Sequence, residues 1–425
     1  FNNSYNSQQR VLAQENTRGT IYAGTGEVLA QTVIAEDGTS VREYPYKNIF
    51  AHVVGYTDKG KTGIEELENY QLIHSDISNR EKLDHELAGE KNPGNDVYTT
   101  LDTSLQQAAS DALGLYRGAI VVTEVKTGRV LAMVSKPDYD PNKIAENWET
   151  LSTDKDKAAL VNRGTQGLYP PGSTFKIVTA LAYIRQNPDS WQNYHYQCNG
   201  AYINGDNKIN CYHGSVHGDV NLMTSFAKSC NASFANIGMS MDREKFGETI
   251  DGLLFNQELS FPLPYNQTKV TLDQDSTDED VIQTSIGQGK TQITPVQLNL
   301  ITAAIANGGK LMQPIVVDRV LNADGKILEK NEPSVYRELM SEKEAEVMTS
   351  LMEDVVQEGT GRKLKDRSYT AAGKTGSAEF SSDKSGFAPA ENPEIAVTVI
   401  VESAGSGSDY AVPLARQVFD AYFSD

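Results

Sequence analysis

A serine and a lysine stand three positions apart in this sequence, Ser173 and Lys176, directly after Pro170-Pro171-Gly172. Two prolines cannot lie inside a helix, and an apolar run with helical spacing follows them, so we predict that a helix begins here. Residues three apart share one face of a helix, where the lysine amine reaches the serine hydroxyl. A neutral amine can act as base for the hydroxyl, and the positive end of the helix favours an oxyanion nearby. The pair therefore predicts a serine nucleophile activated by a lysine.

This pair is not specific on its own, because serine is a common helix cap and Ser-x-x-Lys occurs often by chance. Two further motifs follow it, Ser229-Cys230-Asn231 in a helical neighbourhood and Lys374-Thr375-Gly376 on a strand predicted over residues 369–380. Three such motifs in this order form the signature of serine enzymes that react with penicillin. Their combination predicts a serine acyltransferase site.

Other catalytic patterns fit this sequence less well. A phosphate-binding loop that ends at Lys374-Thr375 would need glycine where Ser368 stands, and one that ends at Lys290-Thr291 would need glycine where Thr284 stands. No serine at a predicted helix start lies in a Gly-x-Ser-x-Gly motif, which argues against a hydrolase with a Ser-His-Asp triad. We expect the six histidines to be surface or loop residues.

The three cysteines leave three states open. Cys198 and Cys211 flank a Gly- and Asn-rich loop, and a disulfide between them would contribute about 3 kcal/mol. His213 and His217 follow Cys211 closely, so a metal site is an alternative, although no Cys-x-x-Cys pair supports it. Free thiols are the third state. We favour the disulfide between Cys198 and Cys211 and predict no metal in the site.

The composition limits the class of protein. The chain has 425 residues, 39% hydrophobic and 22% charged, which is enough for two or three folded domains. Its net charge of −19 argues against nucleic acid and anionic membrane surfaces as partners. No apolar run approaches the roughly 20 residues of a membrane helix, and residues 395–401 fit a buried strand. Since the chain begins with Phe1, we expect a longer native protein whose N-terminal anchor this sequence lacks.

Turn signals and periodicity divide the chain into two parts. Residues 1–95 are polar and turn-rich, with strands predicted at 28–34 and 41–46 and a charged helical stretch at 63–90. The turn Asn92-Pro93-Gly94-Asn95 ends this part, so we place the domain boundary there and assign residues 96–425 to a second domain.

The second domain has the pattern of an antiparallel sheet covered by helices. Strands at both of its ends enclose a helix-dominated middle, which predicts the α+β class. The predicted elements are a helix at 105–115, a β-hairpin formed by 119–125 and 129–134, strands at 369–380 and 394–402, a flexible connection at 403–408, and a helix at 414–422.

At this point the sequence resembles the class B penicillin-binding proteins, the monofunctional peptidoglycan D,D-transpeptidases. The resemblance covers most of the chain. It rests on the three motifs and on Arg18-Gly19-Thr20-Ile21, residues 26–30, 98–102 and 127–133, Asp140-Pro141-Asn142, Asn162-Arg163, Gly287-Gln288-Gly289, Thr294-Pro295 and residues 373–379. It implies a penicillin-binding fold with an all-helical subdomain, preceded by a small β-rich pedestal or dimerisation-like domain at residues 1–95.

The resemblance also implies a role for each motif residue. Ser173 would attack the carbonyl between two D-alanines of a stem peptide, Lys176 would take its proton, and Ser229 would relay a proton to the leaving amine. Asn231 would hold the substrate amide, and Lys374 would lower the pKa of Lys176 as a second cation. The remaining binding residues are Lys374, Thr375, Gly376 and Ser377, with the backbone N–H groups of Ser173 and Ser377 as oxyanion hole.

The family's function follows as an expectation. The enzyme would cross-link cell-wall stem peptides on the extracytoplasmic face of the membrane, would be inhibited covalently by β-lactams, and would need no cofactor. Its partners would include donor and acceptor peptides, a membrane glycosyltransferase and other cell-wall synthesis proteins. A β-lactamase or a β-lactam-binding sensor is the alternative. Glu258 lies where a deacylating base could stand, but Pro262 takes the place of the asparagine that its motif needs.

One segment departs from the family pattern. Residues 379–385 lead directly to Gly386-Phe387-Ala388-Pro389, without the aromatic-rich segment expected between them. Either the hairpin is short here or residues of a loop are absent from this sequence.

Overall fold

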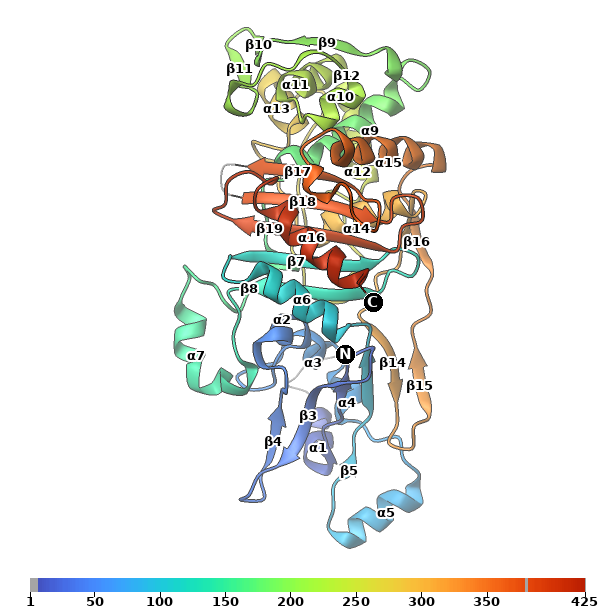
Figure 1. The fold of residues 1–425 in the computed structure, drawn as a ribbon. Coiled ribbons are helices and arrows are strands. Elements are labelled where there is room, and N and C mark those ends of the chain that lie inside the picture. Colours follow the sequence, from blue (N-terminus) through green and yellow to red (C-terminus); the bar gives the residue numbers. More distant parts are fainter. Residues whose placement is uncertain (1–6, 379–380, 425) are drawn as a thin grey trace.

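The computed structural model describes residues 7–378 and 381–424, which form three stacked parts (Figure 1). A helical lobe with small β-ribbons lies at one end, a five-stranded sheet with helices lies in the middle, and a β-rich part that contains the N-terminal segment lies at the other end. Among the described residues, no helix has both the length and the apolar character needed to cross a bilayer.

The central sheet is antiparallel throughout, with the strand order β17-β18-β19-β7-β8. Its Val- and Ile-rich strands are buried because helices cover both faces. The predicted hairpin and the buried strand at 395–401 are confirmed. The strands are β7 (Gly118–Glu124), β8 (Val130–Lys136), β17 (Ala372–Ala378), β18 (Ser381–Ala388) and β19 (Ile395–Glu402).

Helices from the two ends of the second domain share one face of this sheet. These are α6 (Thr103–Leu113) and α16 (Ala411–Tyr422), which also pack against each other. Both helices were predicted from their apolar spacing. The α+β prediction is therefore confirmed.

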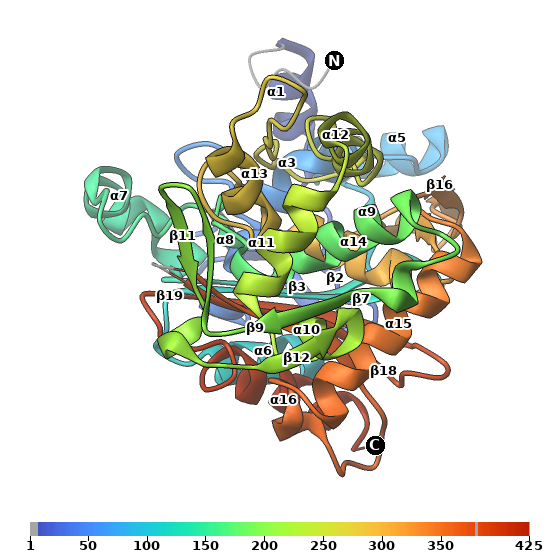
Figure 2. The same cartoon turned by 90° about the horizontal axis from the view of Figure 1, so that it is seen from above.

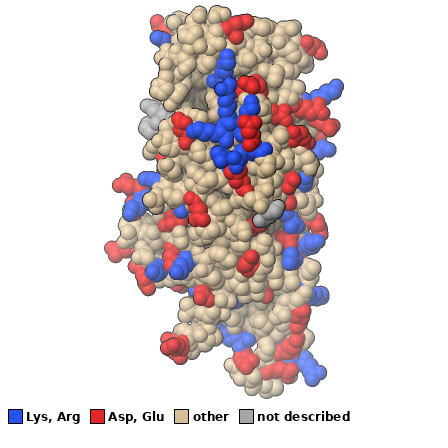
Figure 3. Space-filling model, in the orientation of Figure 1, with Lys and Arg blue, Asp and Glu red and all other residues tan. Residues whose placement is uncertain are grey.

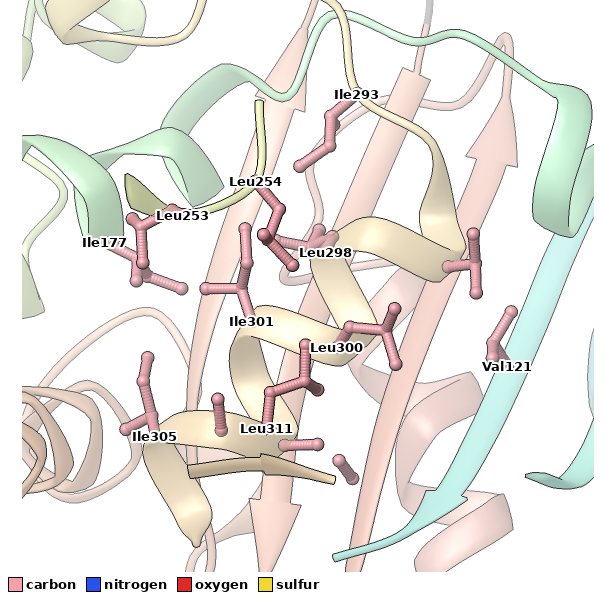
Figure 4. Close-up of a cluster of buried hydrophobic side chains, with 14 of the residues drawn as sticks. Val121, Ile177, Leu253, Leu254, Ile293, Leu298, Leu300, Ile301, Ile305 and Leu311 are labelled. Carbon is pink, nitrogen blue, oxygen red and sulfur yellow. The ribbon is translucent and has the colours of Figure 1, made fainter. Parts of the chain in front are cut away.

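Helix α14 (Pro295–Ala306) covers the opposite face, and every one of its residues is buried. Figure 4 shows its leucines and isoleucines between Val121 of the sheet and Ile177 of a neighbouring helix. Each such side chain contributes about 1.5–3 kcal/mol by leaving water. The buried amide of Asn299 donates to the carbonyls of Val121 and Ala396, so this helix is tied to two strands.

The helical lobe is inserted between the strands of the sheet and carries two of the three motifs. Figure 2 shows its β-ribbons lying beside α10 and α11. Its elements are α9 (Lys176–Gln186), β9 (His195–Cys198), β10 (Ala201–Asn204), β11 (Asn207–Asn210), β12 (Gly218–Asn221), α10 (Leu222–Ala227), α11 (Asn231–Ser240), α12 (Arg243–Gly252) and α13 (Asp278–Ser285).

A six-stranded sheet of order β15-β14-β6-β2-β3-β4 forms the core of the third part. Strand β6 pairs with β2 on one side and with β14 on the other, so the sheet draws on both predicted domains. The predicted boundary after residue 95 falls directly before β6. The strands are β2 (Ile21–Tyr22), β3 (Val28–Ile34), β4 (Ser40–Glu43), β6 (Asp96–Thr99), β14 (Val317–Leu321) and β15 (Ile327–Lys330).

The remaining elements are short or peripheral, apart from the long helix α15. The charged helical stretch predicted at 63–90 is confirmed, and it consists of three helices. These elements are α1 (Ser7–Glu15), β1 (Asn16–Thr17), α2 (Ala51–Val54), α3 (Gly63–Leu67), α4 (Asn69–Ile73), α5 (Asn79–Ala88), β5 (Asn92–Pro93), α7 (Ile144–Thr153), α8 (Arg163–Gln166), β13 (Lys310–Met312), β16 (Val335–Glu338) and α15 (Glu342–Gln357).

One of the histidines contradicts the expectation of surface or loop positions. His52 is buried in α2, where its Nε2 lies 2.7 Å from the carbonyl oxygen of Ala159. Burial lowers the pKa of His52 to about 4, so the ring is neutral at pH 7. The side chain fills the core with a single satisfied polar contact, which histidine content alone does not reveal.

Charge is spread unevenly over the surface. Figure 3 shows basic side chains gathered below the helical lobe, whereas acidic side chains are scattered over the rest of this face. The chain as a whole has 57 acidic and 38 basic residues.

A buried ion network joins three segments of the N-terminal part. Glu65 of α3 is fully buried, and its two carboxylate oxygens accept hydrogen bonds from Arg18 and Arg42, both at 2.7 Å. Burial opposes ionisation, but the two guanidinium groups hold the pKa of Glu65 below its ordinary value. The carboxylate therefore neutralises two cations that would otherwise repel each other.

We predict that Glu65→Gln lowers the free energy of unfolding by about 3–5 kcal/mol, because it leaves two guanidinium groups without their anion. Denaturant unfolding of the purified chain measures the loss. Glu66→Gln is the matched control, since Glu66 is adjacent and exposed. Equal stability of the two variants would show that the network contributes nothing.

Candidate active site

The turn that carries Ser173 is held by backbone contacts. Residues Gly172–Phe175 form one turn of 3-10 helix, and α9 begins directly after it at Lys176. The predicted helix start is therefore right, with one tighter turn preceding the α-helix. Gly172 adopts a φ of 50° and its N–H donates to the carbonyl of Gly287 at 2.8 Å. This bond anchors the nucleophile turn to a loop more than a hundred residues away.

The amine of Lys176 is the centre of the site. The side chain is fully buried, and its Nζ lies 3.0 Å from the Oγ of Ser173. It also lies 2.8 Å from the carbonyl oxygen of Ser229 and 2.7 Å from the Oδ1 of Asn231. A neutral amine has two N–H donors and one lone pair. The two acceptors take both donors, so the lone pair is left for the hydroxyl proton of Ser173.

Ser229 lies in a turn between α10 and α11, not within a helix. Its φ of 56° is in the left-handed region, which is uncommon for any residue other than glycine. This conformation places its Oγ 3.2 Å from the Nζ of Lys176 and 2.9 Å from the Nζ of Lys374. The hydroxyl of Ser229 thus bridges the two lysines.

Lys374 reaches the same point from strand β17. It is fully buried, and its Nζ donates to Ser229 Oγ and, at 2.9 Å, to the carbonyl of Thr375. The ring of Phe226 lies beneath the ammonium, with 5.6 Å from Nζ to its centroid. The three motifs, which are far apart in sequence, therefore meet around two amines and two hydroxyls.

Burial is the main cause of the low pKa of both lysines. It lowers the pKa of Lys176 to about 7, so much of this amine is neutral at physiological pH. Burial, followed by the nearby Lys176, also lowers the pKa of Lys374. The expectation that Lys374 lowers the pKa of Lys176 therefore needs correction, because burial is the cause that lowers it.

A cavity of about 230 Å³ opens in front of these groups. Its wall combines the helical lobe, β17 and the loop that precedes α16. The residues that line it are Ser173, Tyr212, Ser215, His217, Lys228, Ser229, Asn231, Thr360, Thr375, Gly376, Ser377, Ser406 and Ser408. Glu258, the residue considered as a deacylating base, is exposed and is not part of this lining.

The structure adds Thr360 to the predicted site. Its hydroxyl lies 2.5 Å from that of Thr375, and both face the cavity. Thr360 stands between Gly359 and Gly361, after the long helix α15. A threonine between two glycines is the only local signal that could have drawn attention to it.

The segment predicted as a flexible connection, residues 403–408, is part of the cavity wall. The N–H of Gly407 donates to the hydroxyl of Ser377 at 2.9 Å, and Ser406 and Ser408 face the cavity. The small residues of this segment allow it to approach β17 closely. Its composition alone was typical of a linker.

The departure from the family pattern falls at the turn between β17 and β18. Residues 379 and 380 lie outside the described residues, and on either side Ala378 pairs with Ser381. The choice between a short hairpin and absent loop residues concerns this segment and therefore lies outside the described residues.

The predicted disulfide is not present. The sulfurs of Cys198 and Cys211 lie 3.7 Å apart as free thiols, whereas a disulfide bond measures about 2.05 Å. Cys211 lies equally close to Cys230, at 3.8 Å between sulfurs, and His217 Nδ1 lies 3.5 Å from the sulfur of Cys198. These four side chains could together hold a metal ion.

Comparisons with known proteins agree with this arrangement. The family described as "Penicillin binding protein transpeptidase domain" matches residues 118–420, which is more than half of the chain. A second family, "Penicillin binding protein A dimerisation domain", matches residues 18–97.

Individual relatives match over nearly the whole chain. The peptidoglycan D,D-transpeptidase PbpA of Mycolicibacterium smegmatis is 32% identical, over 97% of this chain and 91% of its own length. The D,D-transpeptidase domain of a peptidoglycan glycosyltransferase from Eggerthella lenta superimposes with a TM-score of 0.86 at 31% identity, over 96% of this chain and 99% of that chain. The imipenem acyl-enzyme complex of penicillin-binding protein A from M. tuberculosis gives 0.86 at 29% identity, with the same coverage.

The contact between Gly287 and the nucleophile turn leads to a prediction. A Cβ at Gly287 would lie 2.1 Å from the carbonyl oxygen of Gly172, and the φ of 72° disfavours any side chain. We expect Gly287→Ala to cost about 1–3 kcal/mol more of the free energy of unfolding than Gly289→Ala, measured by denaturant unfolding. Gly289 has a similar φ of 68°, but its Cβ would meet only a glutamine side chain. If both variants lose the same amount, backbone contact with the nucleophile turn does not constrain position 287.

Proposed function

Because this chain belongs to the penicillin-binding protein transpeptidases, we propose that Ser173 is the nucleophile of the family's reaction. The chain is a penicillin-sensitive peptidoglycan D,D-transpeptidase, which cross-links cell-wall stem peptides. One observation carries the assignment of Ser173. Its hydroxyl lies 3.0 Å from a fully buried lysine amine whose pKa is about 7, and Ser173 itself lines the cavity.

Acylation begins with transfer of the Ser173 proton to Lys176. The neutral amine is oriented by its two acceptors, Ser229 O and Asn231 Oδ1, so that its lone pair faces the hydroxyl. The serine oxygen then attacks the carbonyl between the two D-alanines of the donor peptide. The backbone N–H groups of Ser173 and Ser377 receive the negative charge of the tetrahedral intermediate.

The leaving D-alanine needs a proton on its amine and a partner for its carboxylate. Ser229 supplies the proton, because its hydroxyl contacts both lysines and can pass on the proton that Lys176 has accepted. Lys374 provides the positive charge for the carboxylate, and Thr375 with Thr360 provides the hydroxyl donors. Asn231 is placed to bind the amide of the donor peptide with its Nδ2 group. An acceptor amine then attacks the acyl-enzyme and forms the cross-link.

The two parts of the chain have separate tasks in this proposal. Residues 1–95 form the pedestal that contacts partner proteins, among them a membrane glycosyltransferase, and residues 96–425 form the transpeptidase domain. The family matches to residues 18–97 and 118–420 support this division. Since peptidoglycan is the substrate, the site of action is the extracytoplasmic face of the membrane.

A β-lactamase would require a general base near the acyl ester. Glu258 does not face the cavity, and no other carboxylate is among the described residues that line it. Water at the ester therefore has no carboxylate to activate it. This arrangement favours a long-lived acyl-enzyme over a hydrolase.

We predict one equivalent of ring opening and then a plateau when the chain reacts with a chromogenic cephalosporin. Mass spectrometry should place the adduct on the peptide that contains Ser173, and Ser173→Ala should remain unlabelled. An adduct elsewhere would refute the nucleophile. Continued turnover at about 1 per second or faster would make the chain a hydrolase.

The pKa of Lys176 predicts how acylation depends on pH. The amine is the base only when neutral, so the rate should rise as pH increases through about 7 and level off above it. With that pKa, the second-order rate of penicillin acylation should increase about tenfold between pH 6 and pH 8.

Lys176→Arg provides the comparison for this profile. Arginine cannot lose its proton in a protein, so the variant should acylate about two to four orders of magnitude more slowly, with no rise near pH 7. A variant rate near that of the wild type would show that the lysine is not the base.

A further inference from the structure

Three cysteines and one histidine converge directly behind the wall of the active-site cavity. Cys198 ends β9, Cys211 follows β11, His217 precedes β12, and Cys230 caps the N-terminus of α11. Their potential ligand atoms all lie within 4.8 Å of one another. The three cysteines are buried, and His217 is half-buried at the edge of the cavity.

Three of the separations between these atoms match the edges of a tetrahedral zinc site, and the others lie within 4.8 Å. With Zn–S bonds of about 2.3 Å and Zn–N bonds of about 2.0–2.1 Å, a regular tetrahedron has S···S edges of about 3.8 Å and S···N edges of about 3.6 Å. The sulfur of Cys211 lies 3.7 Å from that of Cys198 and 3.8 Å from that of Cys230. His217 Nδ1 lies 3.5 Å from the sulfur of Cys198.

We propose that Cys198, Cys211, His217 and Cys230 bind one structural Zn²⁺ ion that holds the Ser229–Asn231 turn in its active geometry. Three thiolates and one imidazole form a common donor set for structural zinc, and soft thiolate ligands select zinc over magnesium or calcium. On binding, the three thiols release three protons, so the ligands carry three negative charges and the site a net charge of −1.

The local fold has the features of a metal site rather than of an ordinary core. The ribbons β9–β12 and β10–β11 are two-stranded and polar, and a short ribbon of this kind is not stable by itself. Their buried contacts converge on the cysteines, with Tyr196 and Tyr202 packed around them. The N–H of Ser233 donates to the sulfur of Cys230 at 3.4 Å, as a backbone amide does toward a metal-bound thiolate.

The position of Cys230 connects the metal to the reaction. This residue stands between Ser229 and Asn231, and both of these contact the amine of Lys176. Ser229 has a left-handed backbone, which persists only when its surroundings hold it. A zinc–sulfur bond at Cys230 supplies that restraint.

A second link runs through Cys211. The Nδ2 of Asn231 donates to the carbonyl of Asn210 at 3.1 Å, and Asn210 is the neighbour of Cys211. One ion bonded to Cys211 and Cys230 therefore fixes both sides of this hydrogen bond. Loss of the ion would free the amide group proposed to bind the donor peptide.

Metal content provides the first test. The full chain is purified under reductant, without chelators or metal-affinity resin, and analysed by inductively coupled plasma mass spectrometry. We expect about one zinc ion per chain. Substitution by Co²⁺ should give the intense visible absorption of tetrahedral thiolate coordination. Absence of stoichiometric metal, or a Cys198–Cys211 disulfide in the purified chain, would overturn the proposal.

His217→Ala and His213→Ala form a matched pair for the ligand assignment. His213 is exposed, lies four positions earlier and is not part of the cluster. Loss of a ligand should weaken zinc binding, measured by competition with a chromophoric chelator, by more than the roughly 10–100-fold that loss of a supporting outer residue costs. His213→Ala should bind zinc as the wild type does. Equal affinities for the two variants would refute the role of His217.

The link to the reaction is tested on the wild type alone. No substitution is made, so a folding defect of a variant cannot account for the result. Removal of zinc by a chelator should slow penicillin acylation at least about tenfold, and added Zn²⁺ should restore it. If the acylation rate does not change when zinc is removed, the link to the Ser229–Asn231 turn is refuted. This readout rests on the proposed function, whereas metal content does not, so a chain that binds zinc but never labels at Ser173 would count against the proposed function alone.

Discussion

The amine of Lys176 is removed from water entirely, and yet it must remain available as a base. These two conditions are compatible only because Ser229 O and Asn231 Oδ1 accept its N–H groups, while the third direction faces the hydroxyl of Ser173. Burial without those acceptors would cost several kcal/mol. Burial with them lowers the pKa to about 7 and orients the lone pair. The turns around this amine serve to maintain that balance.

Each acceptor depends in turn on a different part of the fold. The carbonyl of Ser229 points at the amine because its residue adopts a left-handed backbone. The side chain of Asn231 is held by Asn210, at the end of a polar β-ribbon. Ser173 itself is fixed by the contact between Gly172 and Gly287. Helix α14 and the central sheet provide the rigid support behind these loops, since their core is continuous and tightly buried. A buried lysine base therefore depends on a large folded domain, because the few groups that contact it are held in place by distant segments.

The cysteine cluster extends the same logic to the helical lobe. This lobe has long connections and two short ribbons, and the strained turn at Ser229 lies on its inner edge. The hydrophobic cluster beside the two ribbons is small, because it consists of the three cysteines and Ala232 with Tyr196 and Tyr202 packed against them. A metal ion would stabilise such a region with a few strong bonds in place of a larger core. The proposed zinc site and the proposed catalytic amine are thus neighbours for a structural reason.

The sequence predicted the features that are set by neighbours along the chain. The helix start at Ser173, the hairpin of β7 and β8, the buried strand β19 and helix α16 all follow from proline, turn residues and apolar periodicity, which act over a few residues. The three motifs were found for the same reason.

What could not be predicted depends on packing between distant segments. The contact of Thr360 with Thr375, the role of residues 403–408 in the cavity wall, the buried position of His52 and the dominant effect of burial on Lys176 are of this kind. The spacing of Cys198 and Cys211 allowed a disulfide, but the fold brings Cys230 and His217 to the same point. Only the folded chain sets those distances, because they arise where segments far apart in sequence are pressed together.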